Sequence, residues 1–137
     1  MSDAYGYDTV GQELLAAGID VLAGSLTTSL ASQEAEVFYP RKARVQVALT
    51  RSAANVSPVT LYFAAIGLPG QAYPNIPSFS MTVDLSDPML AALGAPTDIV
   101  ADAYFNADTY YAIKLLGVRN DGATDITGLT ATVNYKR

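Results

Sequence analysis

The residue types that carry most enzyme chemistry are missing from this chain. Its 137 residues include no cysteine and no histidine, which excludes thiolate nucleophiles, imidazole bases and the usual zinc ligands. The remaining candidates are two carboxylate pairs, Glu34 with Glu36 and Asp98 with Asp102. Each pair shares one face of a predicted strand, where two carboxylates can in principle divide acid and base roles as in glycosidases. Nothing nearby in the sequence sets the two members of a pair apart, so we interpret both as solvated strand faces and expect no enzyme and no catalytic residue.

Two further motifs have simple structural explanations. The segment Asn120–Asp125 loosely resembles a calcium loop, but the acidic residue that closes such a loop is missing, and a hairpin turn explains its glycine. We therefore expect no metal and no cofactor. Asn55–Ser57 is a formal glycosylation sequon that Pro58 follows directly, and we interpret it as a turn.

Charge is segregated along the chain, whose net charge is −5. Residues 1–40 hold six acids and no base, and residues 52–113 hold five aspartates and no base. An acidic chain with one short basic stretch is a poor nucleic-acid binder, because that affinity comes from neutralising many phosphates. Segregated charge instead suits contact between copies of the chain or docking on a charged partner.

The basic stretch contains Arg41, Lys42, Arg44 and Arg51. Lys42 and Arg44 share the outward face of a predicted strand. One interpretation is protection of a sheet edge, where charges prevent a strand from pairing with a foreign strand. The other is docking on an acidic partner, for which Arg41, Lys42 and Arg44 are the candidate residues.

Tyrosine supplies the second set of candidate partner-binding residues. The chain has nine tyrosines and no tryptophan. Most of these rings should pack inside the domain, but Tyr5 and Tyr7 lie in a polar, glycine-spaced arm over residues 1–12, and Tyr73 lies in a proline-rich loop over residues 67–77. Tyrosine commonly anchors interfaces in such places.

Period-two alternation of apolar residues predicts strands along most of the chain. They cover residues 14–23, 34–39, 42–51, 59–66, 79–85, 99–105, 109–118 and 129–135. The first of these also fits a helical stripe, and we prefer a strand because Gly18 weakens a helix. Asp87 and Pro88 are typical of a helix start, which predicts one short helix over Ser86–Gly94.

These elements predict an all-β fold, an antiparallel β-sandwich of the Ig-like or jelly-roll type with seven or eight strands. We expect the arm over residues 1–12 and a single domain over residues 13–137. Met1–Val10 has no base and no apolar core, so we expect no secretory signal. The longest apolar run, Leu61–Ile66, is too short for a membrane helix, so we expect a soluble protein without a membrane partner.

The layout of the whole chain resembles the head decoration proteins, or capsid cement proteins, of tailed bacteriophages. The resemblance is carried by the glycine and tyrosine arm, by the RKARVQVAL strand over residues 41–49 with the PVTLYF strand over residues 58–63, and by the terminal LTATVNY strand over residues 129–135. It implies a non-enzymatic virion structural protein on the capsid surface. The implied partners are the major capsid protein and further copies of the chain, most often in a homotrimer.

Two other classes of protein share some of these features. A phage tail or fibre protein has the same arm, segregated charge and missing catalytic chemistry. A carbohydrate-binding module uses the same sandwich but binds sugars on exposed aromatic platforms, and without tryptophan only tyrosines remain for that role.

Overall fold

The computed structural model describes residues 11–30, 32–37, 42–51, 58–85 and 97–136, which form nine strands and contain no helix. The strands are β1 (Gln12–Val21), β2 (Ser25–Thr27), β3 (Ala35–Glu36), β4 (Lys42–Arg51), β5 (Val59–Ile66), β6 (Phe79–Val83), β7 (Thr97–Asn106), β8 (Ala112–Asn120) and β9 (Ile126–Lys136). The short helix predicted over Ser86–Gly94 lies outside the described residues. The unexpected strand is β2, whose three residues are too few to show alternation.

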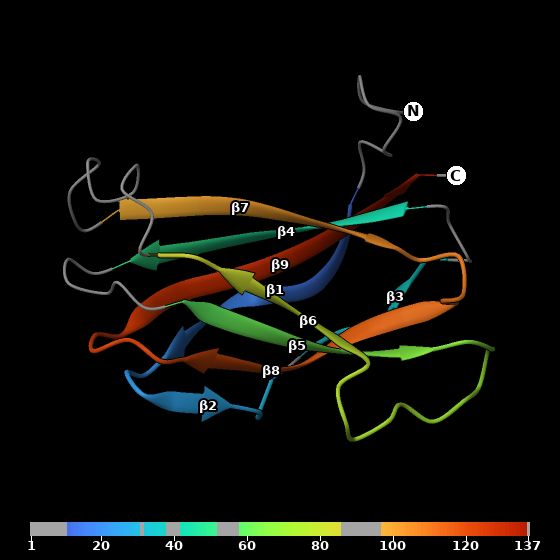
Figure 1. Cartoon of the computed structure of the whole chain (residues 1–137), viewed down its shortest axis with the longest axis horizontal. Coiled ribbons are helices and arrows are strands. Elements are labelled where there is room, and N and C mark those ends of the chain that lie inside the picture. The colour runs from blue at the N-terminus through green and yellow to red at the C-terminus, as the bar shows by residue number, and fades with distance from the viewer. Residues whose placement is uncertain (1–10, 31, 38–41, 52–57, 86–96, 137) are drawn as a thin grey trace.

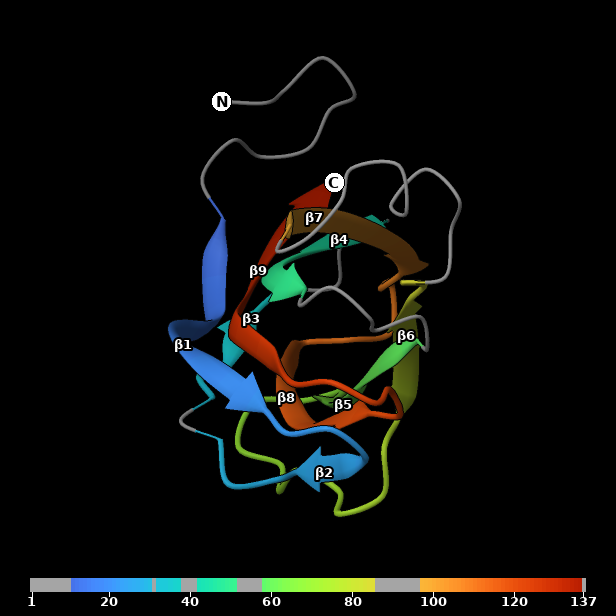
Figure 2. The same ribbon diagram turned by 90° about the vertical axis from the view of Figure 1, so that its left-hand side faces the viewer.

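The strands form two antiparallel sheets that face each other, as Figures 1 and 2 show. The first sheet has the order β1-β9-β4-β7, and the second has the order β2-β8-β5-β6, with β3 also paired to β8. The predicted all-β antiparallel sandwich is therefore confirmed. Since β1 begins at Gln12, the sandwich starts at the predicted last residue of the arm, one residue before the predicted start of the domain.

The pairing of the strands is nested along the chain. The first strand pairs with the last, β2 and β3 pair with β8, β4 pairs with β7, and β5 pairs with β6. If β2 and β3 are counted as one interrupted strand, this is the arrangement of a jelly roll, a long hairpin folded over into two sheets. The strand order thus selects the jelly roll over the Ig-like sandwich.

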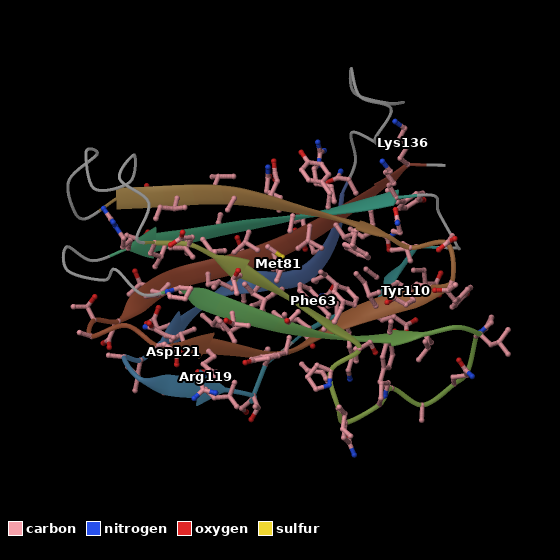
Figure 3. All side chains as sticks on the ribbon, viewed as in Figure 1. Phe63, Met81, Tyr110, Arg119, Asp121 and Lys136 are labelled. Carbon is pink, nitrogen blue, oxygen red and sulfur yellow. The ribbon has the colours of Figure 1, made fainter. Side chains whose placement is uncertain are left out.

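The core lies between the two sheets because each strand buries alternate residues. On β4 the inward residues Ala43, Val45, Val47 and Leu49 are buried, as their alternation predicts. Strands β5, β8 and β9 supply much of the rest of the core, and β1, β3, β6 and β7 contribute further buried residues. Figure 3 shows Phe63 and Met81 between the sheets. The largest enclosed side chains are those of Phe63, Leu14, Leu15, Leu61, Leu85, Ile113, Leu115, Ile126 and Leu129.

Strand β1 is confirmed as a strand, but it is irregular. Its register against β9 shifts three times between Glu13 and Val21. Two neighbouring residues, Leu14 and Leu15, are both fully buried, so the alternation is broken and the sequence imitates a helical stripe. Gly18 lies so close to β9 that a Cβ at this position would stand 3.1 Å from the Cα of Gly128.

A cluster of aromatic rings closes the side of the sandwich where β6 and β7 form the two sheet edges. The ring of Phe79 stacks on that of Phe63 at 4.8 Å and on that of Tyr110 at 5.6 Å. It also meets the ring of Phe105 at 4.6 Å with a tilt of 36°. Phe79 therefore joins residues of β5 and β7, which belong to different sheets.

We expect Phe79→Ala to lower the free energy of unfolding by about 3 kcal/mol, because it leaves a cavity among three rings. The measurement is urea unfolding of the isolated protein. The matched control is Val100→Ala on the outer face of β7, where the side chain is 65% exposed and the expected change is below about 0.5 kcal/mol. Equal effects of the two substitutions would contradict the bridging role of Phe79.

Candidate functional site

Three cations gather on the outer face of the β1-β9-β4-β7 sheet, and we call Lys42, Arg44 and Lys136 the basic corner. Lys42 of β4 lies directly opposite Lys136 of β9, and Arg44 lies opposite Asn134. Residues paired in this way project from the same face of a sheet. Figure 3 shows Lys136 on the outer side of this sheet.

The position of β4 contradicts edge protection as the role of these cations. β4 lies between β9 and β7, so both of its edges are already paired. Arg51 does not belong to the basic corner, because its side chain is 3% exposed and its Nη1 donates a hydrogen bond of 3.3 Å to the carbonyl oxygen of Leu85. Arg41 lies outside the described residues. Of the cations predicted to dock on a partner, Lys42 and Arg44 therefore lie on this face. Lys136 lies beside them and was not predicted from the sequence.

The outer face of the same sheet carries carboxylates toward its other end. Thr50 donates a hydrogen bond of 2.7 Å to Asp98, and Gln46 donates one of 3.1 Å to Asp102. Four residues along a strand span about 13 Å, which exceeds the roughly 5 to 10 Å between the carboxylates of glycosidases. On this face Asp98 lies at the end away from the basic corner, whereas Asp102 lies in the middle, in the row next to Arg44. The two aspartates are separated along β7 by more than the glycosidase spacing.

The other predicted carboxylate pair is tied into local structure. Glu34 accepts a hydrogen bond of 2.7 Å from the hydroxyl of Tyr73. Glu36 is held through its backbone, because its N–H donates to Oε1 of Gln12 at 3.0 Å and its carbonyl oxygen accepts from Nε2 of Gln12 at 2.5 Å. Gln12 thereby fastens β1 to β3 at the start of the sandwich.

Tyr73 lies in the proline-rich loop after β5. Its hydroxyl contacts a residue of the same chain, Glu34, and so is not left exposed for a partner. Besides its bond to Glu34, its ring lies under the ammonium of Lys114, whose Nζ is 5.0 Å from the ring centroid. Partial burial and then the neighbouring Glu34 raise the pKa of the Tyr73 hydroxyl well above its ordinary value. Tyr5 and Tyr7 lie outside the described residues, so the three predicted tyrosines are not shown to form one surface.

The outer face of the second sheet contains a pocket of about 400 Å³, which we call the Tyr62 pocket. It is lined by Leu26, Thr28, Tyr62, Asn75, Pro77, Leu116 and Gly117. A register shift between β5 and β8 creates it: Tyr62 pairs with Gly117, whereas Phe63 pairs with Leu115. Leu116 is thus an extra residue, and the glycine beside it leaves no side chain to fill the surface.

An ion pair stands beside the Tyr62 pocket. Nε of Arg119 lies 2.8 Å from Oδ1 of Asp121, and Figure 3 shows the two residues close to β2. The hydrogen bond and charge of Asp121 raise the pKa of Arg119, and a hydrogen bond from Arg119 to Tyr62 adds a smaller effect.

The segment that resembles a calcium loop is organised by one buried amide. Nδ2 of Asn120 donates to the carbonyl oxygens of Val21 at 3.1 Å and Thr124 at 2.9 Å, and its Oδ1 accepts from Gly122 N–H at 2.9 Å. Oδ1 of Asp125 accepts a hydrogen bond of 2.9 Å from Ala23 N–H. These oxygens are used to close the β8–β9 hairpin and to join it to β1.

Two structural features are absent from the described parts of the chain. Those residues contain no group of three or more acidic, histidine or cysteine side chains placed to hold a metal ion. They also contain no helix with the length and apolar character required to span a bilayer.

We expect Asn120→Ala to lower the free energy of unfolding by about 2 to 3 kcal/mol, because it removes three buried hydrogen bonds and leaves their backbone partners unsatisfied. Urea unfolding measures this loss. Excess calcium chloride, compared with EDTA, should leave the melting temperature of the wild-type protein unchanged. A rise in melting temperature with calcium would instead favour the metal-loop interpretation.

The raised pKa of Tyr73 predicts its behaviour at high pH. The protonated hydroxyl is the form that binds Glu34, so its contribution is fully present below the unfolded pKa of about 10 and is lost as pH rises through the folded pKa. In an absorbance titration of phenolate, Tyr73→Phe should remove a component that ionises later than an ordinary tyrosine. Loss of an ordinary component instead would show that the Glu34 contact does not form in solution.

No protein-family model matches the chain, and no curated protein matches it. Among solved structures, the chain is similar to one described by the words "Bacillus endospore appendages form a novel family of disulfide-linked pili". The two share 13% sequence identity and a TM-score of 0.39 over 93% of this chain and 87% of that chain. At this TM-score the similarity carries no argument about function.

Proposed function

We propose that this chain is a non-enzymatic structural protein that decorates a larger protein shell by docking its basic corner on an acidic surface. The observation that carries the proposal is the register of β4 with β9, which places Lys42 opposite Lys136 with Arg44 in the next outward row. Like charges directly opposite each other destabilise a sheet. Lys42 and Lys136 thus place two positive charges side by side on this face, and an acidic surface of a partner would be attracted to both.

The carboxylate geometry supports a structural role. Asp98 and Asp102 are separated along β7 beyond the spacing of a catalytic pair, and Glu34 is engaged by Tyr73. The basic corner lies at one end of this face and Asp98 at the other, so the charge on the face is not the same at its two ends. Complementary charge of this kind orients a partner and selects one docking register.

The N-terminal arm belongs to the same proposed binding region. Gln12 of β1 pairs with Val133, and a Cβ on Gly11 would lie 3.3 Å from the side chain of Asn134. The chain therefore enters the sandwich beside the residue that faces Arg44. Tyr7 and Tyr5 precede Gly11 by four and six residues, which can span at most about 14 to 21 Å, so both tyrosines can contact a partner that is docked on the basic corner.

The specific form that we propose is decoration of a phage capsid, with the major capsid protein as the partner and a homotrimer as the assembled state. Its support is the resemblance carried by residues 41–49 and 129–135, which form parts of β4 and β9, the two strands that bear the basic corner. Arg41 and Arg137 adjoin this corner in the sequence. A tail or fibre protein would use the same surface on a different shell.

We expect the double variant Lys42→Glu, Lys136→Glu to bind purified capsids that lack this protein about tenfold more weakly than the wild type at low salt. The reason is that each exposed ion pair contributes up to about 1 kcal/mol, and reversal replaces attraction with repulsion at two sites. The measurement is the number of labelled copies per capsid against protein concentration. Wild-type binding should also weaken as salt rises, because salt screens exposed charges.

The matched control is Lys114→Glu, Arg119→Glu, which makes the same change in net charge on the second sheet. It should bind capsids as the wild type does. No binding by any form rejects the decoration role. If binding is unchanged by salt and by the charge reversal at Lys42 and Lys136, the basic corner is not the docking surface.

A further inference from the structure

We propose that the outer edge of β7 binds an extended segment of a partner protein as an additional strand, and that this segment alternates basic with apolar residues. The edge lies at the side of the first sheet, whereas the proposed docking surface is the basic corner on its outer face. The inference therefore goes beyond the proposed function and does not depend on it. It rests on the regularity of β7, on its partly exposed inward residues and on the aspartates of its outward face.

Among the edge strands that the structure describes, β7 alone is both long and regular. It pairs with β4 over the ten residues Thr97–Asn106 without a register shift, and in the described part of the chain no strand pairs with its other side. Figure 1 shows β7 at the upper margin of the first sheet. Edge strands are commonly protected by bulges or by shortness. β1 shifts register three times, β2 has three residues and β6 has five, so β7 is the edge best suited to accept a further strand.

The inward face of β7 is less covered than that of its neighbour β4. The inward residues of β4 over 43–49 are at most 3% exposed. On β7, by contrast, Ala101, Ala103 and Phe105 are only partly buried. Phe105 contacts the ring of Phe79, which is also partly buried on this side of the sandwich. A strand added beside β7 projects alternate side chains toward these residues, and apolar side chains there remove further apolar surface from water.

The outward face of β7 sets the charge of the partner segment. Asp98 and Asp102 lie on this face, each accepts a hydrogen bond from a β4 side chain, and β7 contains no base. A carboxylate accepts several hydrogen bonds, and opposite charges facing each other on neighbouring strands are stabilising. Lysine or arginine at outward positions four residues apart would face both aspartates. Val100 between them is 65% exposed and offers apolar surface to the stems of such side chains.

A second copy of β7 fits this edge less well than a basic segment does. Two antiparallel β7 strands can pair Val100 with Tyr104, but this register places the two copies of Asp102 directly opposite each other. Like charges in that position are destabilising, and the net charge of −5 also makes copies of the chain repel. A basic segment is attracted by the same charges. The chemistry of the occupant is therefore basic on its outward face and apolar on its inward face.

The test uses a fluorescently labelled peptide of ten residues, the length of β7, in which lysine alternates with valine. We expect saturable binding to the full-length protein at moderate salt. Amide protons on the outer edge of β7 should exchange about tenfold more slowly in the complex, because the added strand hydrogen-bonds them. A control peptide with proline in place of a central valine keeps every charge but loses a backbone donor, so it should bind about tenfold more weakly.

The matching variant of the protein is Asp98→Asn, Asp102→Asn. It should weaken peptide binding about tenfold by removing two exposed ion pairs. Asparagine keeps a carbonyl oxygen for the hydrogen bonds from β4, so the melting temperature should stay that of the wild type. The matched control is Glu13→Gln, Asp20→Asn, which makes the same change in net charge on β1, the opposite edge of the same sheet. It should bind the peptide as the wild type does.

The variant Lys42→Glu, Lys136→Glu should retain peptide binding, which separates this result from the capsid experiment. Absence of saturable binding by the alternating peptide overturns the proposal. So does binding that leaves hydrogen exchange in β7 unchanged, or that the variants of β1 and β7 weaken equally, because either result shows only a general attraction between opposite charges. A dimer of the wild-type protein in sedimentation that protects the β7 amides without peptide would assign this edge to a second copy and also overturn the proposal.

Discussion

The outer surfaces of this molecule depend on one constraint, the pairing of β4 with β9 on one side and β7 on the other. Both partners follow β4 at a distance in sequence, so the sheet forms only when remote segments meet. The inward residues of β4 are apolar from Ala43 to Leu49, and the buried Arg51 that follows is hydrogen-bonded to Leu85, whereas the outward residues face away from the core. Lys42 and Arg44 therefore project from a strand whose two edges are both paired.

The alternation of apolar residues predicted most of the sandwich, because a strand with one buried face carries that pattern in its own sequence. It was least clear in β1, where Leu14 and Leu15 are buried side by side. Register between remote strands has no such local signal. The neighbour of Lys42 on β9, Lys136, could not be found by reading either strand alone. Edge protection was wrong for the same reason, since strand order decides which strands are edges.

On the second sheet, in contrast to the first, the sequence of a single strand does carry a signal of a surface feature. Its pocket lies beside the single extra residue on β8, and Gly117 forms part of the lining. A glycine inside a strand pattern is a known sign of a bulge, and this was the signal available in the sequence. This signal does not show which residues line the pocket. Asn75 and Pro77 reach it from the loop after β5, while Leu26 and Thr28 reach it from β2 and the residue after it.

The nested pairing has a consequence for how the chain is made. The innermost pair, β5 with β6, is complete as soon as residues 59–83 have left the ribosome, but β1 must wait for residues 126–136. Until then the apolar side chains of Leu14 and Leu15 have no partner strand beside them. Pairing of such remote segments is intrinsically slow. The core of this domain is therefore completed late in synthesis, and the nascent chain must be protected from aggregation until its last strand emerges.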